Sequence, residues 1–444
     1  MIGKYFKLRE RQTSVKIECV AGLTTFLTMA YIIFTNPDIL SDNTGMDREA
    51  LIAVTCIVSA VATIMVGIFA NAPIAMAPGM GLNAFFAYSL VLTDKVPWET
   101  ALGVVFLSGL FFLILTLLGL RKKLVAAIPP SLVSAIAVGI GLFITFIGLK
   151  NLGVIVRGSE ATLVKAGPLK ATVLIGLCGL TVMLFLEMIK ISGALLIGII
   201  FSTVLAAIFG YIPKPTQLIT SNLNIGALAF HLDILGALKW SLFGSIFTLM
   251  FIDMFDSVGT LVACCHQANM VDEKNRIKGL GKLLGLDAVA TMIGALLGTS
   301  TTTSYIESAA GIEQGGRSGL TSIITGGLFL LALVFVPIVE IVPRYAAAPA
   351  LIMVGLFMMK EIKRIDFTSL EEAFPAFIIM VMIALSYSIS TGLAFGFISF
   401  VMMKVISGKA RDVKPAMWII AILSLMFLTL DRLPGTIEYL RSLI

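Results

Sequence analysis

Long apolar stretches recur along the whole chain and leave little room for a soluble domain. Fourteen of them are separated by short loops: 19–40, 51–71, 74–92, 99–120, 126–148, 171–188, 191–212, 238–265, 281–297, 299–312, 318–342, 346–360, 372–388 and 391–406. About 20 apolar residues span the hydrocarbon core of a bilayer, so most of these stretches are long enough to cross it. Only 13% of the residues are charged, against roughly 25% in soluble domains. The sequence therefore predicts an all-α polytopic membrane protein.

Two of the fourteen segments are too irregular to be ordinary spanning helices. Residues 71–85 (NAPIAMAPGMGLNAF) and 298–308 (GTSTTTSYIES) are rich in Gly, Pro, Ser or Thr. Non-helical backbone at membrane depth is tolerated only where protein or a water-filled cavity surrounds it. We therefore expect a broken or half-length element in the third segment and another in the tenth.

The first seven segments resemble the second seven. Residues 60–63 (AVAT) recur as 288–291, and residues 141–143 (GLF) recur as 355–357, in the same order. A repeat with an odd number of spans must be inserted upside down. Inverted repeats with a broken segment at matching positions are typical of secondary transporters, whose substrate binds near the midplane between the repeats.

The distribution of charge predicts which side of the membrane each loop faces. Basic residues cluster at 1–18, 121–123, 274–282, 360–364 and 404–414. Cytoplasmic loops are enriched in Lys and Arg, so we place the N-terminus in the cytoplasm and the multi-pass chain in the cell inner (plasma) membrane. The basic loop 149–170 goes against this trend. The net charge of +6 reflects the same bias, and we expect no nucleic-acid partner.

Carboxylates lie inside the apolar segments. Asp253 and Asp256 are three residues apart in the eighth segment, and so lie on neighbouring turns of one helix face, while Glu307 lies in the tenth. A carboxylate at bilayer depth costs several kcal/mol and usually faces a cavity, a partner or an ion path. We predict that the two segments face each other across a polar site. The alternative is structural carboxylates satisfied by neighbouring donors, and Asp253 in particular could be a supporting or gating residue.

Further residues could complete this site. Asn83, in the third segment, offers both a donor and an acceptor, and the run that ends at Thr303 can leave backbone groups free for a ligand. Asp287 could support the site, relay protons or form a structural pair. Thr28 could line the site or bond its own helix backbone. Phe255, like Phe85 and Phe86, could stack on a flat ligand, although packing is the simpler role.

The motif inventory argues against other classes of protein. The sequence contains no GxSxG, HExxH or P-loop lysine, and no metal-ligand spacing joins its cysteines to His231 and His266. An ATP-driven pump is therefore disfavoured, and no metal is expected. Acids, an amide, hydroxyls and aromatics without a basic residue in mid-span suit a small neutral planar molecule rich in N–H groups, cotransported with H⁺ or Na⁺. The alternatives are another neutral heterocycle or an anion on the same fold, a channel, or a membrane enzyme that uses the acid pair.

Four stretches resemble a known family: 6–37 (FKLRERQTSVKIECVAGLTTFLTMAYIIFTNP), 77–88 (APGMGLNAFFAY), 251–261 (FIDMFDSVGTL), and 298–312 (GTSTTTSYIESAAGI) followed by 315–323 (GGRSGLTSI). They are similar to the AzgA-like purine permeases of the nucleobase/ascorbate transporter superfamily. The resemblance covers nearly the whole chain. It implies about fourteen spans in two inverted repeats of seven, with a core domain, a gate domain, and short strands in segments 3 and 10.

The resemblance also implies a division of the chain. Residues 1–18 would be the cytoplasmic N-terminus, 19–120 and 238–342 the two halves of the core domain, and 121–212 and 343–408 the two halves of the gate domain. Residues 213–237 would be an extracellular or periplasmic loop. The C-terminal segment 409–444 has an open topology, because its apolar stretch 416–432 has no repeat partner. The gate domain commonly mediates dimerisation in this family, so a homodimer is expected.

The implied activity is proton-coupled import of adenine, guanine or hypoxanthine by alternating access, with membrane lipid around the protein and no cofactor beyond the proton gradient. Motif matching places Asp256 and Glu307 at the purine-binding acids, and Asn83 and Thr28 at polar positions of spans three and one. Phe255 and Thr303 would complete the substrate contacts. Proton coupling or support of the site would fall to Glu307, Asp287 and Asp253, and Asp256 could also take the coupled proton.

Overall fold

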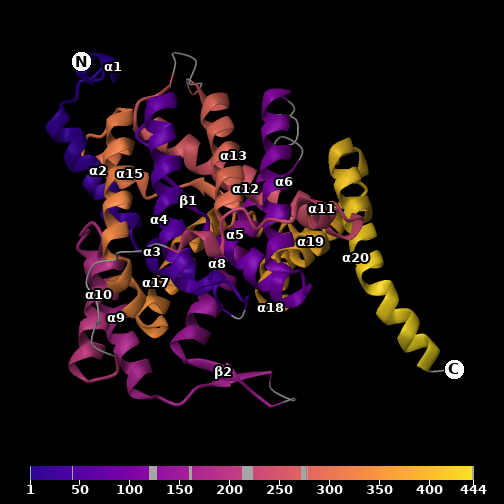
Figure 1. Cartoon of the computed structure of the whole chain (residues 1–444). Coiled ribbons are helices and arrows are strands. Elements are labelled where there is room, and N and C mark those ends of the chain that lie inside the picture. Colours follow the sequence, from indigo (N-terminus) through magenta and orange to yellow (C-terminus); the bar gives the residue numbers. More distant parts are fainter. Residues whose placement is uncertain are drawn as a thin grey trace.

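The computed structural model describes residues 2–42, 44–119, 128–159, 163–212, 224–271, 277 and 279–442 (Figure 1). Within these residues, ten helical runs are long and apolar enough by length and composition to cross a membrane, from Val15–Leu40 to Ile389–Ile406. Shorter apolar helices cover Met80–Thr93, Ala194–Ile208 and Pro415–Thr429. The all-helical polytopic fold predicted from the sequence is confirmed.

The first half of the chain contains these elements in order: α1 (Ile2–Tyr5), α2 (Val15–Met29), α3 (Ile32–Leu40), α4 (Arg48–Met65), the π-helical turn η1 (Val66–Ala70), β1 (Met76–Pro78), α5 (Met80–Ala84), the π-helix η2 (Phe85–Thr93), α6 (Trp98–Leu117), α8 (Pro130–Leu152), β2 (Ile155–Arg157), β3 (Val164–Ala166), α9 (Ala171–Met188) and α10 (Ala194–Ile208). The predicted first span is thus two helices, interrupted at Ala30 and Tyr31. The β2–β3 hairpin in the predicted loop 149–170 was not expected from the sequence.

The second half contains these elements: η3 (Ile225–Ala227), α11 (Ile234–Ala237), η4 (Trp240–Leu242), α12 (Phe243–Gln267), α13 (Leu280–Leu297), β4 (Thr302–Ser304), α14 (Ser308–Glu313), α15 (Gly319–Ala332), η5 (Leu333–Phe335), α16 (Val336–Ile341), α17 (Arg344–Met358), η6 (Met359–Arg364), α18 (Leu370–Ser386), α19 (Ile389–Ile406), η7 (Ala410–Asp412) and α20 (Pro415–Ser442). Helix α20 is longer than the predicted segment 416–432. The side chains of Asp431 and Arg432 lie outside those that the structure describes.

Several helices begin at side chains that satisfy their free backbone N–H groups. Ser14 accepts a hydrogen bond from the Ile17 backbone N–H at the start of α2, and Asp47 accepts one from Ala50 at the start of α4. Such capping residues are favoured because the first N–H groups of a helix have no partner within it. These starts therefore follow from local sequence.

A more distant cap joins the two halves of the chain. The carboxylate of Glu18, fully buried in α2, accepts hydrogen bonds from the backbone N–H groups of Arg317, Ser318 and Thr321 at 3.0, 3.3 and 3.1 Å. The Thr321 hydroxyl donates to the same carboxylate at 2.5 Å. The N-terminus of α15 attracts negative charge, so Glu18 ties α15 to the first helix of the bundle.

The two broken segments pair with each other. Strands β1 and β4 are antiparallel and fully buried, with Met76 opposite Ser304 and Pro78 opposite Thr302. The pairing is extended by a hydrogen bond from the Gly79 N–H to the Thr301 carbonyl at 2.9 Å. Each segment thus satisfies backbone groups that the other would otherwise leave unpaired inside the membrane. The predicted short strands in segments 3 and 10 are confirmed.

Helices pack in pairs that exchange partners between the two halves. Helix α6 of the first half packs on α13 of the second half. The counterpart of α6 in the second half, α15, packs on α4 of the first half. In the same way α12 contacts α6 and α2 contacts α15, while α8 packs on its own counterpart α17. Repeats related by a two-fold axis in the membrane plane give this reciprocal pattern. The inverted-repeat architecture is therefore visible in the packing as well as in the sequence.

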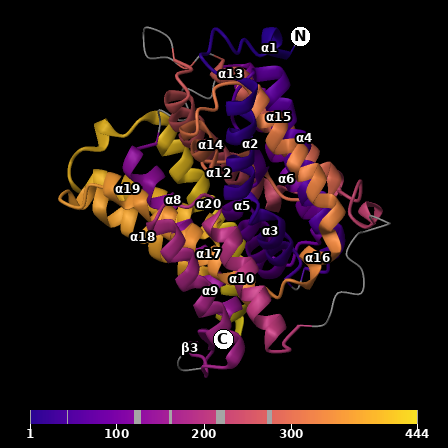
Figure 2. The same cartoon turned by 90° about the vertical axis from the view of Figure 1, so that its left-hand side faces the viewer.

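The helices also separate into two groups (Figure 2). Helices α8, α9, α17, α18 and α19 lie together, and α2, α4, α6, α13 and α15 lie together beside them. Strands β1 and β4 belong to the second group, since they contact α4 and α13. The fold thus has the two-domain form expected of core and gate. The residue boundaries assigned to the two domains from the resemblance stay a prediction.

Ionic contacts join the two groups at the end of the molecule where the hairpin lies, opposite the N-terminus (Figure 1). Asp42, just after α3 and buried, accepts from Arg344 of α17 at 3.0 Å and from the Tyr88 hydroxyl of η2 at 3.0 Å. The Lys150 ammonium of α8 lies 3.4 Å from the same carboxylate. We call these four residues the Asp42 network. It closes this end of the boundary between the groups.

Candidate functional site

Asp256 lies midway along α12, yet its side chain is exposed. Gly259, Ala263 and His266 are also exposed and continue the same face of α12 toward its C-terminal end, whereas Asp253, one turn back, is 1% exposed. A carboxylate is costly against lipid, so we interpret this face of α12 as the wall of a water-accessible path. The path leads from Asp256 to the end of the molecule where the N-terminus lies and α13 begins (Figure 1).

Asp256 is linked to the strand pair and to the next helix. The Thr303 hydroxyl of β4 donates to Asp256 Oδ2 at 3.5 Å and lies 2.8 Å from the Ser257 hydroxyl. The Ser257 hydroxyl in turn donates to Asp287 Oδ2 on α13 at 2.6 Å. Ser304 donates to the other Asp287 oxygen at 3.2 Å. Asp256 and Asp287, two predicted acids from different helices, are therefore joined through two hydroxyls. That of Thr303 was predicted from the sequence and that of Ser257 was not.

Asp253 and Asp256 face different surroundings although they were predicted on one helix face. Asp253 is buried, and the Thr291 hydroxyl of α13 lies 3.3 Å from its Oδ2, while its Oδ1 has no partner among the described residues. The same Thr291 hydroxyl donates to the Thr302 carbonyl at 2.8 Å. These contacts attach Asp253 to the backbone of β4, behind the exposed Asp256.

Glu307 is held at the start of α14 by the first span. The Tyr31 hydroxyl, from the break between α2 and α3, donates to Glu307 Oε1 at 2.7 Å, and Tyr31 is 2% exposed. The Thr28 hydroxyl donates to the Thr24 and Thr25 carbonyls at 3.0 and 2.9 Å and lies 3.5 Å from the Glu307 carbonyl. Thr28 is therefore bonded mainly to its own helix and touches the site only through backbone.

Asn83 lies on α5, directly after β1, and is fully buried. Its side-chain oxygen accepts a hydrogen bond from the Ser300 hydroxyl, whereas its Nδ2 has no partner among the described residues. A buried amide donor without a partner is costly. Asn83 thus retains a hydrogen-bond donor beside the strand pair.

Of the aromatic candidates, only Phe255 is half-buried. Its ring lies 4.6 Å from that of Phe251, centroid to centroid. Phe85 and Phe86 are fully buried and belong to the packed interior. A role in covering a ligand therefore remains open for Phe255 and is disfavoured for the other two.

The four acids lack a cationic partner among the described residues. Within the part of the chain that the structure describes, no ion pair involves Asp253, Asp256, Asp287 or Glu307, although ion pairs are found elsewhere in the molecule. Asp256 is close enough to Glu307, and Asp253 to Asp287, for their charges to interact. The site is thus an acidic, hydroxyl-rich cluster.

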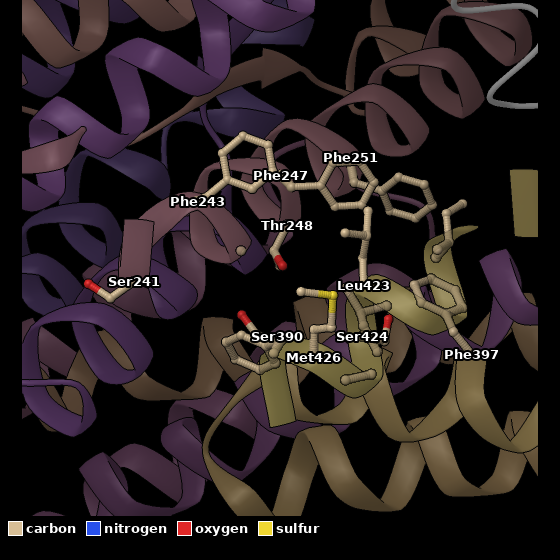
Figure 3. Close-up of a pocket in the computed structure, with 15 residues that line it drawn as sticks. Ser241, Phe243, Phe247, Thr248, Phe251, Ser390, Phe397, Leu423, Ser424 and Met426 are labelled. Atoms are coloured by element: carbon tan, nitrogen blue, oxygen red, sulfur yellow. The ribbon is translucent and has the colours of Figure 1, made fainter. Parts of the chain in front are cut away.

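A cavity of about 430 Å³ lies elsewhere, between α12, α19 and α20 (Figure 3). Its lining is largely aromatic and aliphatic, with Phe247, Phe251 and Phe397 among the side chains and Thr248 and Ser390 among the few polar ones. It borders the first half of α12, whereas Asp256 lies in the second half. None of the predicted site residues lines it, so this cavity is distinct from the acidic cluster.

Three residues that hold predicted site residues were not predicted from the sequence. Tyr31, Ser257 and Ser300 each bond a predicted site residue. The sequence does offer one signal for Tyr31: it is a tyrosine inside an apolar span, three positions after the candidate Thr28.

Paired broken segments with polar groups beside them inside a multi-pass membrane fold are typical of a membrane transporter. The model of the Permease family matches residues 16–395. The chain belongs to this family, and the resemblance predicted from its motifs is confirmed.

Relatives of known designation cover nearly the whole length of the chain. The adenine permease AdeP of Escherichia coli (strain K12) is 41% identical over 96% of this chain and 95% of its own length. The guanine/hypoxanthine permease PbuG of Bacillus subtilis (strain 168) is 42% identical over 96% of this chain and 99% of its own length. The transmembrane domain of a cyanobacterium bicarbonate transporter, BicA, matches with a TM-score of 0.67 at 17% identity, over 84% of this chain and 96% of that chain. At this identity the structural likeness concerns the fold alone.

Proposed function

We propose that the protein imports purine nucleobases across the cell inner membrane by proton symport. The observation that carries the proposal is the acid cluster, which is exposed at Asp256 and has no cationic partner among the described residues. Ionised carboxylates accept hydrogen bonds from N–H groups and repel anions. Purines present several such N–H groups on a planar ring. Relatives designated as adenine and guanine/hypoxanthine permeases support the same substrate class.

In this proposal Asp256 and Glu307 accept purine N–H groups. Asn83 completes the contacts to the ring edge with its Nδ2 donor, which has no partner among the described residues. Phe255 covers the ring face, and Thr303 and Thr28 line the site. Asp253 supports the cluster from behind through Thr291.

The difference between the two ends of the molecule supports alternating access as part of the proposal. The exposed face of α12 opens the cluster toward the end that carries the N-terminus, whereas the Asp42 network closes the opposite end. With the N-terminus in the cytoplasm, this conformation is inward-facing. Movement of the core helices against the gate helices would break the Asp42 network and open the other end. We also propose a homodimer formed through the gate domain.

Uptake of labelled adenine, guanine and hypoxanthine into cells that lack their own purine carriers tests the proposal. We expect uptake of at least one purine, its abolition by a protonophore, and a fall of at least about tenfold for Asp256→Asn, since losing a hydrogen bond to a charged group costs about 1.5–3 kcal/mol. The matched control is Asp366→Asn, an exposed loop acid whose pKa is lowered by hydrogen bonds from Thr368 and which is therefore ionised in the assay. Absence of uptake of all three purines, or concentrative uptake that survives the protonophore, would contradict the proposal.

A further inference from the structure

A continuous row of oxygen atoms leads from the exposed acid to a buried one. Asp256 Oδ2 lies 3.5 Å from Thr303 Oγ1, which lies 2.8 Å from Ser257 Oγ, which lies 2.6 Å from Asp287 Oδ2. Ser257 and Asp287 are fully buried and Thr303 is 2% exposed, whereas Asp256 is exposed. We call this row the hydroxyl row. It connects the water-accessible face of α12 with the interior between α12 and α13.

The number of protons in the hydroxyl row constrains the charge of its ends. The row has three oxygen–oxygen contacts, but the two hydroxyls supply one proton each. If both acids are ionised and each accepts from its neighbouring hydroxyl, Thr303 and Ser257 approach to 2.8 Å with no proton between them. One further proton, on either acid, gives every contact a donor. The row is therefore complete when Asp256 and Asp287 carry one proton between them.

We propose, on the basis of the proton symport proposed above, that Asp256 and Asp287 share one proton and that the hydroxyls of Ser257 and Thr303 relay it between them. The proton of the Asp287 carboxyl passes to Ser257 Oγ as the Ser257 proton passes to Thr303 Oγ1 and the Thr303 proton passes to Asp256 Oδ2. Three O–H bonds break and three form. One negative charge moves from Asp256 to Asp287, and both hydroxyls are restored.

The relay connects the position of the proton to purine binding. With the proton on Asp287, Asp256 is ionised and can accept a purine N–H. With the proton on Asp256, that acceptor is lost and the acid can exchange its proton with water on the exposed face of α12. The contact between Thr303 and Asp256 is the longest of the three. A small movement of β4 relative to α12 would therefore open or close the row at the substrate end.

Other titratable groups face the hydroxyl row. Asp253 on α12 lies beside Thr303, and its charge interacts with Asp256 and Asp287. Glu307, bonded to Tyr31, faces Asp256 from the start of α14, and Tyr305 follows β4. The relay is assigned to Asp256 and Asp287 because consecutive oxygen–oxygen contacts of 3.5, 2.8 and 2.6 Å join these two acids.

The test uses purified full-length protein in proteoliposomes with a pH-sensitive dye inside, the transported purine as substrate, and labelled purine to count molecules. Ser257→Ala removes the central oxygen of the row. We expect purine-driven proton movement to slow at least about tenfold, within the range of a lost proton-transfer group, and its dependence on pH to flatten. The dissociation constant for purine should change by less than about threefold. Ser257→Thr, which keeps the hydroxyl, should restore proton movement.

The matched control is Ser59→Ala on α4, which removes the hydroxyl of a fully buried serine whose Oγ has no partner among the described residues. Its proton-to-purine ratio should equal that of the unmodified protein. If Ser257→Ala is not recovered as a monodisperse protein, Thr303→Val and Thr303→Ser make the same comparison at the neighbouring hydroxyl. The proposal expects the ratio to fall only in the variant that lacks the hydroxyl.

The outcomes separate the two proposals. An unmodified protein that moves purine without protons, or moves no purine, contradicts the proposed function itself. The unmodified protein could instead couple proton movement to purine movement while a hydroxyl-free variant keeps the same proton-to-purine ratio and pH profile. That result overturns the relay and leaves the proposed function standing. A parallel loss of purine affinity and transport in Ser257→Ala that Ser257→Thr does not reverse would assign Ser257 a purely structural role.

Discussion

Tyr31 shows how a single hydroxyl can set the geometry of a binding site. Its phenol reaches Glu307 Oε1 from a different segment of the chain, and Tyr31 is almost fully buried. A hydrogen bond to a charged group contributes about 1.5–3 kcal/mol. We expect Tyr31→Phe to raise the KM for purine about tenfold, because Glu307 loses the contact that orients it.

Uptake kinetics measure this effect. Tyr345→Phe is the control, since the Tyr345 hydroxyl has no partner among the described residues. Equal KM values for the two variants would show that Tyr31 does not position Glu307.

The acids of the site and the hydroxyl of Thr303 could be predicted from the sequence, but Tyr31 and Ser257, which also hold acids, could not. Asp256, Asp287 and Glu307 are conspicuous because a charge inside an apolar span requires an explanation. Hydroxyls carry no such signal, since Thr28, Ser257 and Thr303 all look alike in sequence. Thr28 bonds its own helix, whereas Ser257 bridges two helices. Only the positions of neighbouring elements decide between these roles.

At the scale of elements, Glu18 couples the first helix to α15. Replacing Glu18 by Ala would leave three backbone N–H groups at the start of α15 without their acceptor, those of Arg317, Ser318 and Thr321. A buried unsatisfied donor costs about 1–3 kcal/mol, so we expect Glu18→Ala to lower the free energy of unfolding by at least about 3 kcal/mol.

Thermal unfolding in detergent, monitored by fluorescence-detected size-exclusion chromatography, reports the loss of stability as a lower unfolding temperature. Glu10→Ala is the control, because Glu10 is exposed and paired only with Lys7 three residues away. A Glu18 variant as stable as the Glu10 variant would mean that water replaces the carboxylate at this helix start.

The spans and the broken segments were also predictable as elements, because apolar length and clusters of Gly, Pro, Ser and Thr are local properties. The break at Ala30 and Tyr31 and the β2–β3 hairpin were missed. The first lies in a continuous apolar run, and the second lies in a polar loop with no strong turn signal. The short strands in segments 3 and 10 came from the family resemblance, and no local rule predicts that segments so distant in sequence pair with each other.

At the scale of the whole molecule, the Asp42 network sets the balance between the two open states. Asp42→Asn removes the charge that attracts Arg344 and Lys150 and weakens the closed end. Partly exposed ion pairs contribute up to about 1 kcal/mol each, so we expect the ratio of inward-open to outward-open protein to fall several-fold, by up to about tenfold. Glu361→Gln, at an exposed pair with Arg364, is the control.

Accessibility of the exposed face of α12 reports this equilibrium. Ala263→Cys in a cysteine-free background should react more slowly with a membrane-impermeant thiol reagent in inside-out vesicles when Asp42→Asn is also present. An unchanged labelling rate would show that the Asp42 network does not control which end is open.

The antiparallel pairing of β1 and β4 also has a consequence for synthesis of the protein. More than 200 residues separate the two strands, and at roughly 5–20 residues per second the ribosome needs on the order of ten seconds or more to reach the second. During that interval the β1 segment is made but its partner does not exist, and lipid offers nothing to its backbone groups. The nascent first half must therefore wait in a sheltered place, at the insertion machinery or under a chaperone, until the second half arrives to complete it.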